Sequence, residues 1–236
     1  MIETESSLNG WLATEKPDDA IEYYQDGHGV IHQLPPFRPP DNATYYVDYY
    51  NKLSVKSRAM AHARLGYVLT TTDIIRSAEK RVLDVGFGNG DFLRACADAG
   101  LTPFGYDKYA TDLGDARIRT STAPCVLNEP YDVITFFDAL EHFPEIGFVK
   151  DLRTRFLTIS VPWLHFTIDS AEFLRWKHRK PHEHLHHFTE ESLRAFMLAS
   201  GYTYVHHCNV EDAIRCIGDG GGMPNVLTAT FKKRCS

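Results

Sequence analysis

The sequence predicts an α/β protein built around one mainly parallel β-sheet. Two observations carry this prediction. After Lys80, short apolar runs alternate with amphipathic segments, which is the pattern of repeated strand–helix units. At the start of that region, within residues 81–93, an apolar strand runs directly into a glycine-rich loop and then a helix. The length of 236 residues and the 43% share of hydrophobic residues are sufficient for a full core.

Seven strands are expected, each a short run of apolar and β-branched residues bounded by polar or turn residues. They are Val82–Val85, Thr102–Tyr106, Pro124–Leu127, Asp132–Phe137, Phe156–Val161, Thr203–His207 and Val226–Phe231.

Helical segments fit between these strands. Residues 53–77 have mostly helical spacing of apolar residues and predict one or two helices. The segment Asp91–Ala99 is amphipathic and is followed by Gly100, a residue type that commonly ends helices. A helix over Glu190–Ser200 has Thr189 as its N-cap, and its two leading glutamates suit the positive end of the helix dipole.

Composition changes near residue 52. Residues 1–52 contain six of the twelve tyrosines and a proline-rich stretch at 34–40, which proline prevents from forming helix or inner strand. We expect an irregular N-terminal cap over 1–52 and an α/β domain over 53–236, together one compact unit.

Charge and cysteine usage narrow the class of protein. Asp and Glu outnumber Lys and Arg by 31 to 25, and the net charge of −6 disfavours broad attraction to nucleic acid or to an anionic membrane. Five cysteines without close pairs do not suit a disulfide framework and favour a reducing compartment. With no secretory leader or spanning run in the sequence, we expect a cytoplasmic protein that has no membrane partner.

The glycine-rich loop predicts a nucleotide-type site. Gly86, Gly88 and Gly90 follow the first strand, where the chain must turn sharply and let a ligand approach the backbone. The dinucleotide fingerprint requires a further glycine where this chain has Asp91, which disfavours a nicotinamide cofactor. Asp107 ends the next strand, where a carboxylate can accept both hydrogen bonds of a ribose diol.

These motifs resemble those of the class I S-adenosylmethionine-dependent methyltransferases. The similar segments are Val82–Gly90, Tyr131–His142, which ends in Leu-Glu-His, Ser160–Pro162, and the stretch 186–202. The resemblance implies a Rossmann-like three-layer sandwich with a seven-stranded, mostly parallel sheet whose last strand is antiparallel. It also implies S-adenosyl-L-methionine as the cofactor and makes 53–236 a class I methyltransferase domain.

The resemblance assigns the cofactor-binding residues position by position. The methionine part is surrounded by Asp84, Gly86, Gly88 and Gly90 and lined by Phe137 and Asp138. The ribose is held by Asp107, and the adenine is bordered by Val126 or Leu127. Phe87, within the glycine loop, also belongs to the cofactor-binding set.

Histidine is the compositional anomaly, with 12 residues of which six lie between His165 and His187. His142 and His187 are the candidates for a general base, with His165 and Glu183 behind them, because imidazole titrates near neutrality. A packing role is the alternative for His142. We expect no metal, because the segment 182–187 has neither an H-E-x-x-H pattern nor a neighbouring cysteine.

The function expected is methyl transfer to a small-molecule or biosynthetic-intermediate acceptor at oxygen, nitrogen or carbon. A nucleic-acid methyltransferase is the alternative, using the basic stretch 175–180, which otherwise is a solvated helix end. The net charge opposes it, as does the lack of an Asn/Asp-Pro-Pro-aromatic motif at 136–139. A nicotinamide-dependent oxidoreductase and a non-catalytic cofactor-binding protein are less favoured alternatives.

Overall fold

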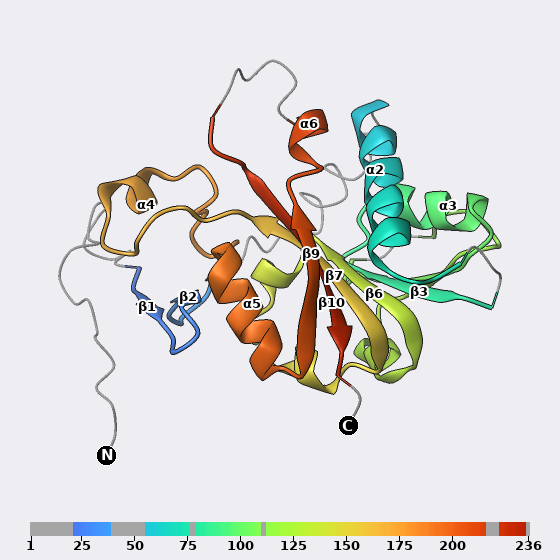
Figure 1. The fold of residues 1–236 in the computed structure, drawn as a ribbon, viewed down its shortest axis with the longest axis horizontal. Coiled ribbons are helices and arrows are strands. Elements are labelled where there is room, and N and C mark those ends of the chain that lie inside the picture. Colours follow the sequence, from blue (N-terminus) through green and yellow to red (C-terminus); the bar gives the residue numbers. More distant parts are fainter. Residues whose placement is uncertain (1–20, 39–54, 76–78, 110–111, 216–221, 235–236) are drawn as a thin grey trace.

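The structure, a computed structural model, describes residues 21–38, 55–75, 79–109, 112–215 and 222–234. In this part of the chain seven strands form one sheet in the order β5-β4-β3-β6-β7-β10-β9 (Figure 1). Their bounds are β3 Arg81–Val85, β4 Thr102–Tyr106, β5 Arg119–Ser121, β6 Tyr131–Phe137, β7 Thr154–Pro162, β9 Tyr202–Cys208 and β10 Val226–Lys233. The strands β3 to β7 pair in parallel, and β10 is antiparallel to both of its neighbours. The predicted α/β fold with a reversed last strand is confirmed.

One predicted strand is wrong. Residues Pro124–Asn128 form a 3₁₀ helix, η1, and the edge strand β5 instead covers Arg119–Ser121. Pro124 stands at the start of η1, where its missing N–H and fixed φ are tolerated. Because β5 is a largely exposed edge strand of polar residues, it lacks the apolar run that sequence analysis seeks.

Helices cover both faces of the sheet, which gives the predicted three layers (Figure 1). The α-helices that pack on it are α2 Val55–Thr71, α3 Asp91–Asp98 and α5 Glu190–Ala199. Val82 and Val133 pack in one core cluster with residues of α2 and α3. Leu83 and Ile134, the next residue of each strand, pack in a second cluster with residues of α5. The period of two along each strand therefore divides the core between the faces.

The helix ends follow the expected local chemistry. Gly100 and Gly201, just beyond α3 and α5, have φ of 80° and 88°, which an L-residue with a side chain seldom adopts. At the start of α5 the Ser192 backbone N–H donates to Thr189 Oγ1 at 3.1 Å, and the Thr189 N–H donates to Ser192 Oγ at 2.9 Å. This reciprocal capping box fixes where α5 begins.

The segment 163–189, between β7 and α5, contains all six of the clustered histidines. It forms the short helix α4 (Ala171–Arg175) and the strand β8 (His186–His187). β8 pairs with β2 (Ile31–Gln33), which pairs with β1 (Tyr23–Gln25). The N-terminal residues 21–38 thus lie against the histidine-rich segment.

The region predicted as an irregular cap is therefore partly regular. Its hairpin turn is closed by Asp26 Oδ1, which accepts the backbone N–H groups of His28 and Val30 at 2.9 Å each. The rest of the predicted cap, 1–20 and 39–52, lies outside the described residues.

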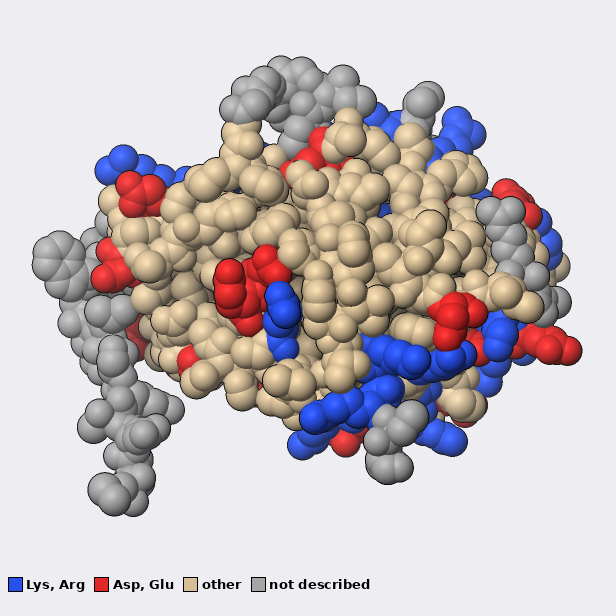
Figure 2. All heavy atoms as spheres, viewed as in Figure 1, with Lys and Arg blue, Asp and Glu red and all other residues tan. Residues whose placement is uncertain are grey.

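The face of the molecule seen in Figure 2 is largely uncharged, and its Lys and Arg side chains gather mainly toward the C-terminal end of the chain. That end of β10 lies beside the amino ends of the parallel strands, opposite the glycine loop.

Across the described segments, every helix is either too short or too polar to traverse a lipid bilayer.

Candidate active site

The glycine loop joins β3 to α3 at the carboxyl end of the sheet. Gly86, Gly88 and Gly90 have φ of 76°, 56° and 76°, in the left-handed region that favours glycine. A Cβ on Gly86 would also lie 2.8 Å from the Cβ of Ala139, which follows β6. The close passage of the loop past Ala139 therefore requires glycine at 86.

Asp107 lies directly beside this loop, as predicted from its place after β4. Its Oδ2 accepts the Gly88 backbone N–H at 3.3 Å, and its Oδ1 accepts the Tyr109 N–H at 2.8 Å. The carboxylate is buried, and burial raises its pKa. Each carboxylate oxygen keeps a second lone pair for a ligand hydroxyl.

A pocket of about 720 Å³ opens beside the loop, within the range of small-molecule sites. The predicted site residues that line it are Asp84, Gly86, Phe87, Gly88, Phe137, Asp138, His142 and Glu183. Other predicted residues do not line the pocket, among them Gly90, Asp107, Val126, Leu127 and His187. Of these, Gly90 belongs to the glycine loop and Asp107 lies beside it.

Asp84, near the end of β3, is a buried acid on the wall of the pocket. Thr135 Oγ1 on β6 donates to Asp84 Oδ1 at 2.7 Å. Burial raises the pKa of Asp84 to about 7, although this hydrogen bond and the charge of Arg64 oppose the rise. The carboxyl is thus poised to change charge near neutrality.

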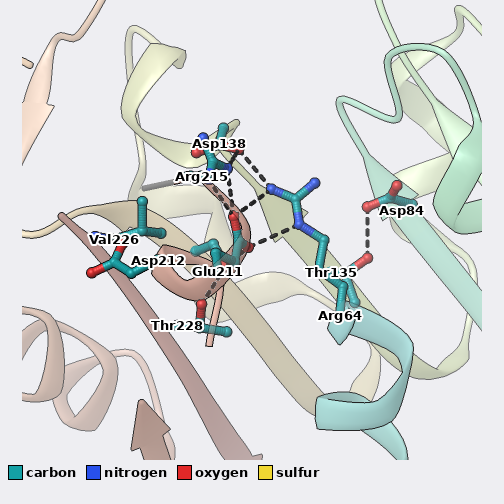
Figure 3. Close-up of polar contacts among 10 residues, drawn as sticks. Arg64, Asp84, Thr135, Asp138, Glu211, Asp212, Arg215, Val226 and Thr228 are labelled. Atoms are coloured by element: carbon teal, nitrogen blue, oxygen red, sulfur yellow. Dashed lines mark hydrogen bonds and ion pairs between the residues drawn. The ribbon is translucent and has the colours of Figure 1, made fainter. Parts of the chain in front are cut away.

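Two arginines and two acids form an ion-pair network across the pocket floor (Figure 3). Arg64 of α2 donates through Nη2 to Asp138 Oδ2 at 2.7 Å and to Glu211 Oε2 at 2.8 Å. Arg215 on α6 (Asp212–Arg215) contacts both acids as well, and its Nε donates to Glu211 Oε2 at 2.9 Å. Ser160 Oγ on β7 donates to Glu211 Oε1 at 2.7 Å. The two cations hold the pKa of Asp138 well below its usual range, despite burial.

Of these four residues only Asp138 was predicted. Arg64, Glu211 and Arg215 come from α2 and from the segment after β9, and no local motif distinguishes them from surface charges. The guanidinium of Arg64 also stacks 4.5 Å from the centre of the Phe137 ring. Asp138 itself has φ of 54°, a conformation that is strained for a non-glycine residue and recurs at functional sites.

The opposite side of the pocket is built from η2 (Leu140–His142) and the segment 163–189. His142 Nδ1 donates to the Glu183 carbonyl at 2.7 Å, and the Leu185 N–H donates to the Glu141 carbonyl at 2.7 Å. The rings of His142 and His184 meet edge to face, with centroids 4.8 Å apart. Burial lowers the pKa of His142, so its ring is neutral near pH 7. Burial and the neighbouring Asp138 raise the pKa of Glu141 well above its usual value.

His187, the second predicted catalytic residue, lies instead in an aromatic cluster beneath α4. Its ring is 1% exposed and packs 5.8 Å from Tyr23, 5.4 Å from Phe173 and 5.7 Å from Trp176, measured between ring centroids. Neither ring nitrogen has a hydrogen-bond partner among the described residues. The structure therefore does not bring His187 to His142.

Val126 and Leu127 lie in η1, which contacts β4, the strand that leads to Asp107. Both are half-buried against the main core cluster. Their predicted position beside adenine stays a prediction.

These features together define the fold of class I methyltransferases. They are a glycine loop after β3, an acid after β4, and a pocket at the carboxyl ends of a sheet in which β10 is reversed. Residues 57–207 match the model of a family described as a methyltransferase domain. The chain belongs to this methyltransferase family, whose cofactor is S-adenosylmethionine.

Individual relatives are distant. A ubiquinone biosynthesis O-methyltransferase of Bartonella tribocorum is 25% identical over 150 residues, which are 53% of this chain and 61% of that protein. The chain thus matches less than two thirds of that relative's length.

Among the solved structures that share the fold are two methyltransferases with bound S-adenosylhomocysteine. The 1,6-didemethyltoxoflavin-N1-methyltransferase of Burkholderia thailandensis, with bound 1,6-didemethyltoxoflavin and S-adenosylhomocysteine, is 17% identical with a TM-score of 0.54, over 94% of this chain and 99% of that one. The magnesium protoporphyrin IX methyltransferase of Synechocystis PCC 6803, with bound S-adenosylhomocysteine, is 15% identical with a TM-score of 0.51, over 76% and 84%.

Proposed function

We propose that this protein transfers a methyl group from S-adenosylmethionine to a small-molecule acceptor. The observation that carries the proposal is a single pocket shared by the glycine loop on one side and by His142, His184 and Lys180 on the other. A cofactor held on the loop side would face an acceptor held on the histidine side, and the two reactants would meet within one pocket.

The loop side fits the cofactor. Asp84 and Asp138 offer carboxylates to the ammonium group, and the backbone of Gly86 and Gly88 allows close approach to the methionine chain. Asp107 retains lone pairs for the ribose hydroxyls. Phe87, Gly90 and Phe137, with Val126 or Leu127 at the adenine, complete the proposed set. Arg64 is a positioning residue, because its ion pairs hold Asp138 at the pocket wall.

Bound S-adenosylmethionine supplies a methyl group on a positively charged sulfur. The chain's own contribution is to hold the acceptor atom in line with that methyl at about 3 to 3.5 Å and to exclude water. For a hydroxyl acceptor, the oxygen lone pair forms the bond to the methyl carbon, the carbon–sulfur electron pair stays on sulfur, and the hydroxyl proton passes to a base or to water. His142 has its Nδ1 on the Glu183 carbonyl, so its Nε2 lone pair is available on the acceptor side.

The basic stretch 175–180 favours a small acidic or hydroxylated acceptor over a nucleic acid. Lys177 and Lys180 line the pocket, which suits a carboxylate or phosphate on the acceptor. Arg179 is used internally: it donates to the Tyr23 hydroxyl at 3.4 Å and to the Leu174 carbonyl at 3.1 Å. Most of the Lys and Arg side chains on the face seen in Figure 2 lie toward the C-terminal end of the chain, at the opposite end of the sheet from the glycine loop. The name of the Bartonella relative adds support for a small hydroxylated acceptor.

Cofactor binding tests the proposal. We expect S-adenosylhomocysteine to bind the full chain in calorimetry, and Asp107→Ala and Asp107→Asn to weaken it by about 10-fold or more, because a charged hydrogen-bond acceptor is lost. Asp73→Asn, on a half-exposed aspartate paired with Arg155, is the matched control and leaves affinity unchanged. Binding of NAD in place of S-adenosylhomocysteine would refute the proposal.

A further inference from the structure

Three metal-ligating side chains come together on the acceptor side of the pocket. Glu141 and His142 lie on η2, and His184 lies in the segment that leads to β8. One potential ligand atom of each residue lies within 4.8 Å of those of the other two. Ligand atoms around a tetrahedral zinc ion lie about 3.4 Å apart. Side-chain movements that shorten these separations by up to about 1.4 Å would therefore close the three ligand atoms around one ion.

The two histidines are already oriented as metal ligands. His142 Nδ1 is 2.7 Å from the carbonyl oxygen of Glu183, and His184 Nδ1 is 2.7 Å from that of His178. A carbonyl oxygen only accepts, so each Nδ1 carries the proton and each Nε2 keeps its lone pair. Metal-bound histidines are held in this way, with the second ring nitrogen donating to a carbonyl or carboxylate.

Glu141 supplies the second, independent observation. The residue is 0% exposed, and neither carboxylate oxygen has a hydrogen-bond partner among the described residues. An unpaired buried acid is costly in a folded protein, and the nearby Asp138 carboxylate adds repulsion when Glu141 is charged. A cation between Glu141 and the two imidazoles removes this cost.

We propose that Glu141, His142 and His184 bind one divalent first-row transition ion. Two imidazoles and one carboxylate suit ions such as Zn²⁺, Mn²⁺ and Fe²⁺, and three protein ligands leave coordination positions open. Since the site faces the acceptor side of the pocket, an open position takes an oxygen of the acceptor. This role rests on the proposed function. A metal at this site restricts the possible acceptors to molecules with a hydroxyl, carboxylate or phosphate oxygen. It also makes the His142 Nε2 a metal ligand.

The surrounding charges are mixed. Lys177 and Lys180 line the same pocket and oppose a bare cation. Glu183 Oε1 pairs with Lys180 Nζ at 3.0 Å and lies 3.9 Å from His184 Nε2, so it offsets the charge of that lysine beside the site. Together they balance an ion that carries an anionic acceptor. The site departs from the sequence-based expectation of no metal, since its ligands come from 141–142 and 184.

Cobalt binding tests the site without any acceptor. We expect the chelator-treated full chain to bind one Co²⁺, seen as visible absorption bands and as a stoichiometry of one in calorimetry. Glu141→Gln, His142→Asn and His184→Asn each weaken binding by about 10-fold or more. His28→Asn, on the exposed β1–β2 turn, is the matched control and binds as the wild type does. Equal Co²⁺ affinity in the wild type and the three variants, or none in the wild type, overturns the site.

Two further measurements separate a lost ligand from a lost fold. Without metal, Glu141→Gln unfolds at the same temperature as the wild type or higher, because it removes an unpaired buried acid. At the same Co²⁺ concentration, the wild type gains more stability than the variant does. A Glu141→Gln protein that gains as much as the wild type contradicts the site. S-adenosylhomocysteine binding is measured in the same samples. If it binds and Co²⁺ does not, the metal site alone is wrong, whereas Co²⁺ binding without S-adenosylhomocysteine binding removes the proposed function.

Discussion

Arg64 and Glu211, 147 residues apart in the chain, form a two-point ion pair with Nε–Oε1 and Nη2–Oε2 distances of 2.8 Å each. The pair ties α2 to the segment after β9, and its Arg64 lines the pocket. Glu211 is fully buried, so its charge depends on these partners.

Removal of Arg64 tests how far this network holds the fold together. We expect Arg64→Met to lower the free energy of unfolding by about 3 kcal/mol, the lower end for a broken buried pair, because Arg215 still contacts Asp138 and Glu211. Arg155→Met removes a half-exposed partner of Asp73 and costs less than about 1 kcal/mol. Urea unfolding followed by circular dichroism measures both, and equal losses would contradict the network's role.

The raised pKa of Asp84 predicts that the stability of the protein depends on pH. Its pKa is about 7 in the folded protein, against an ordinary value of 3.8 for an aspartate. Between these values the folded state keeps a proton that the unfolded state has lost, so stability falls as pH rises from about 4 to 7. Over this pH range the free energy of unfolding falls by as much as about 4 kcal/mol.

The comparison with Asp84→Asn isolates that contribution. From pH 4 to 7, the free energy of unfolding of the wild type should fall relative to that of the variant. Above pH 8, the plots of unfolding free energy against pH for the two proteins should run parallel. Thr135→Val removes the hydroxyl that donates to Asp84 and should move the fall to higher pH. Parallel curves over the whole range would show that Asp84 does not titrate as expected.

Gly86 and Gly66 form a matched pair of glycines. Gly86→Ala places a Cβ 2.8 Å from Ala139 at a positive φ, and we expect it to cost about 1–3 kcal/mol of stability and to weaken S-adenosylhomocysteine binding. Gly66→Ala adds a Cβ that meets nothing within 4 Å inside α2, and should stabilise by about 0.5–1 kcal/mol. Calorimetry and urea unfolding give both quantities. A stable, fully binding Gly86→Ala protein would show that the loop does not need this conformation.

His187→Leu separates packing from catalysis. Because both ring nitrogens of His187 are buried without partners, an aliphatic side chain of similar size should keep or raise stability, by up to about 1–2 kcal/mol. The same variant should bind S-adenosylhomocysteine and Co²⁺ as the wild type does. A loss of either binding would return His187 to the site.

Local sequence determined the parts of this protein that local physics controls. The run Arg81–Val85 followed by three spaced glycines forms strand, turn and helix because the apolar pattern and the left-handed glycines leave few alternatives. The capping box at Thr189 likewise fixes the start of α5 within four residues of chain. The family, the sheet and the glycine-loop half of the pocket follow from such segments.

Tertiary structure alone decided the rest, because it depends on residues that only folding brings together. The polar edge strand β5 exists through its pairing with β4, not through an apolar pattern of its own. The Arg64–Glu211 pair joins residues whose charges look like ordinary surface charges in the sequence. His142 and His187 have the same side chain, yet one lines the pocket and the other fills an aromatic core. Their roles differ because their burial and their neighbouring residues differ, and the spacing of residues in the sequence shows neither.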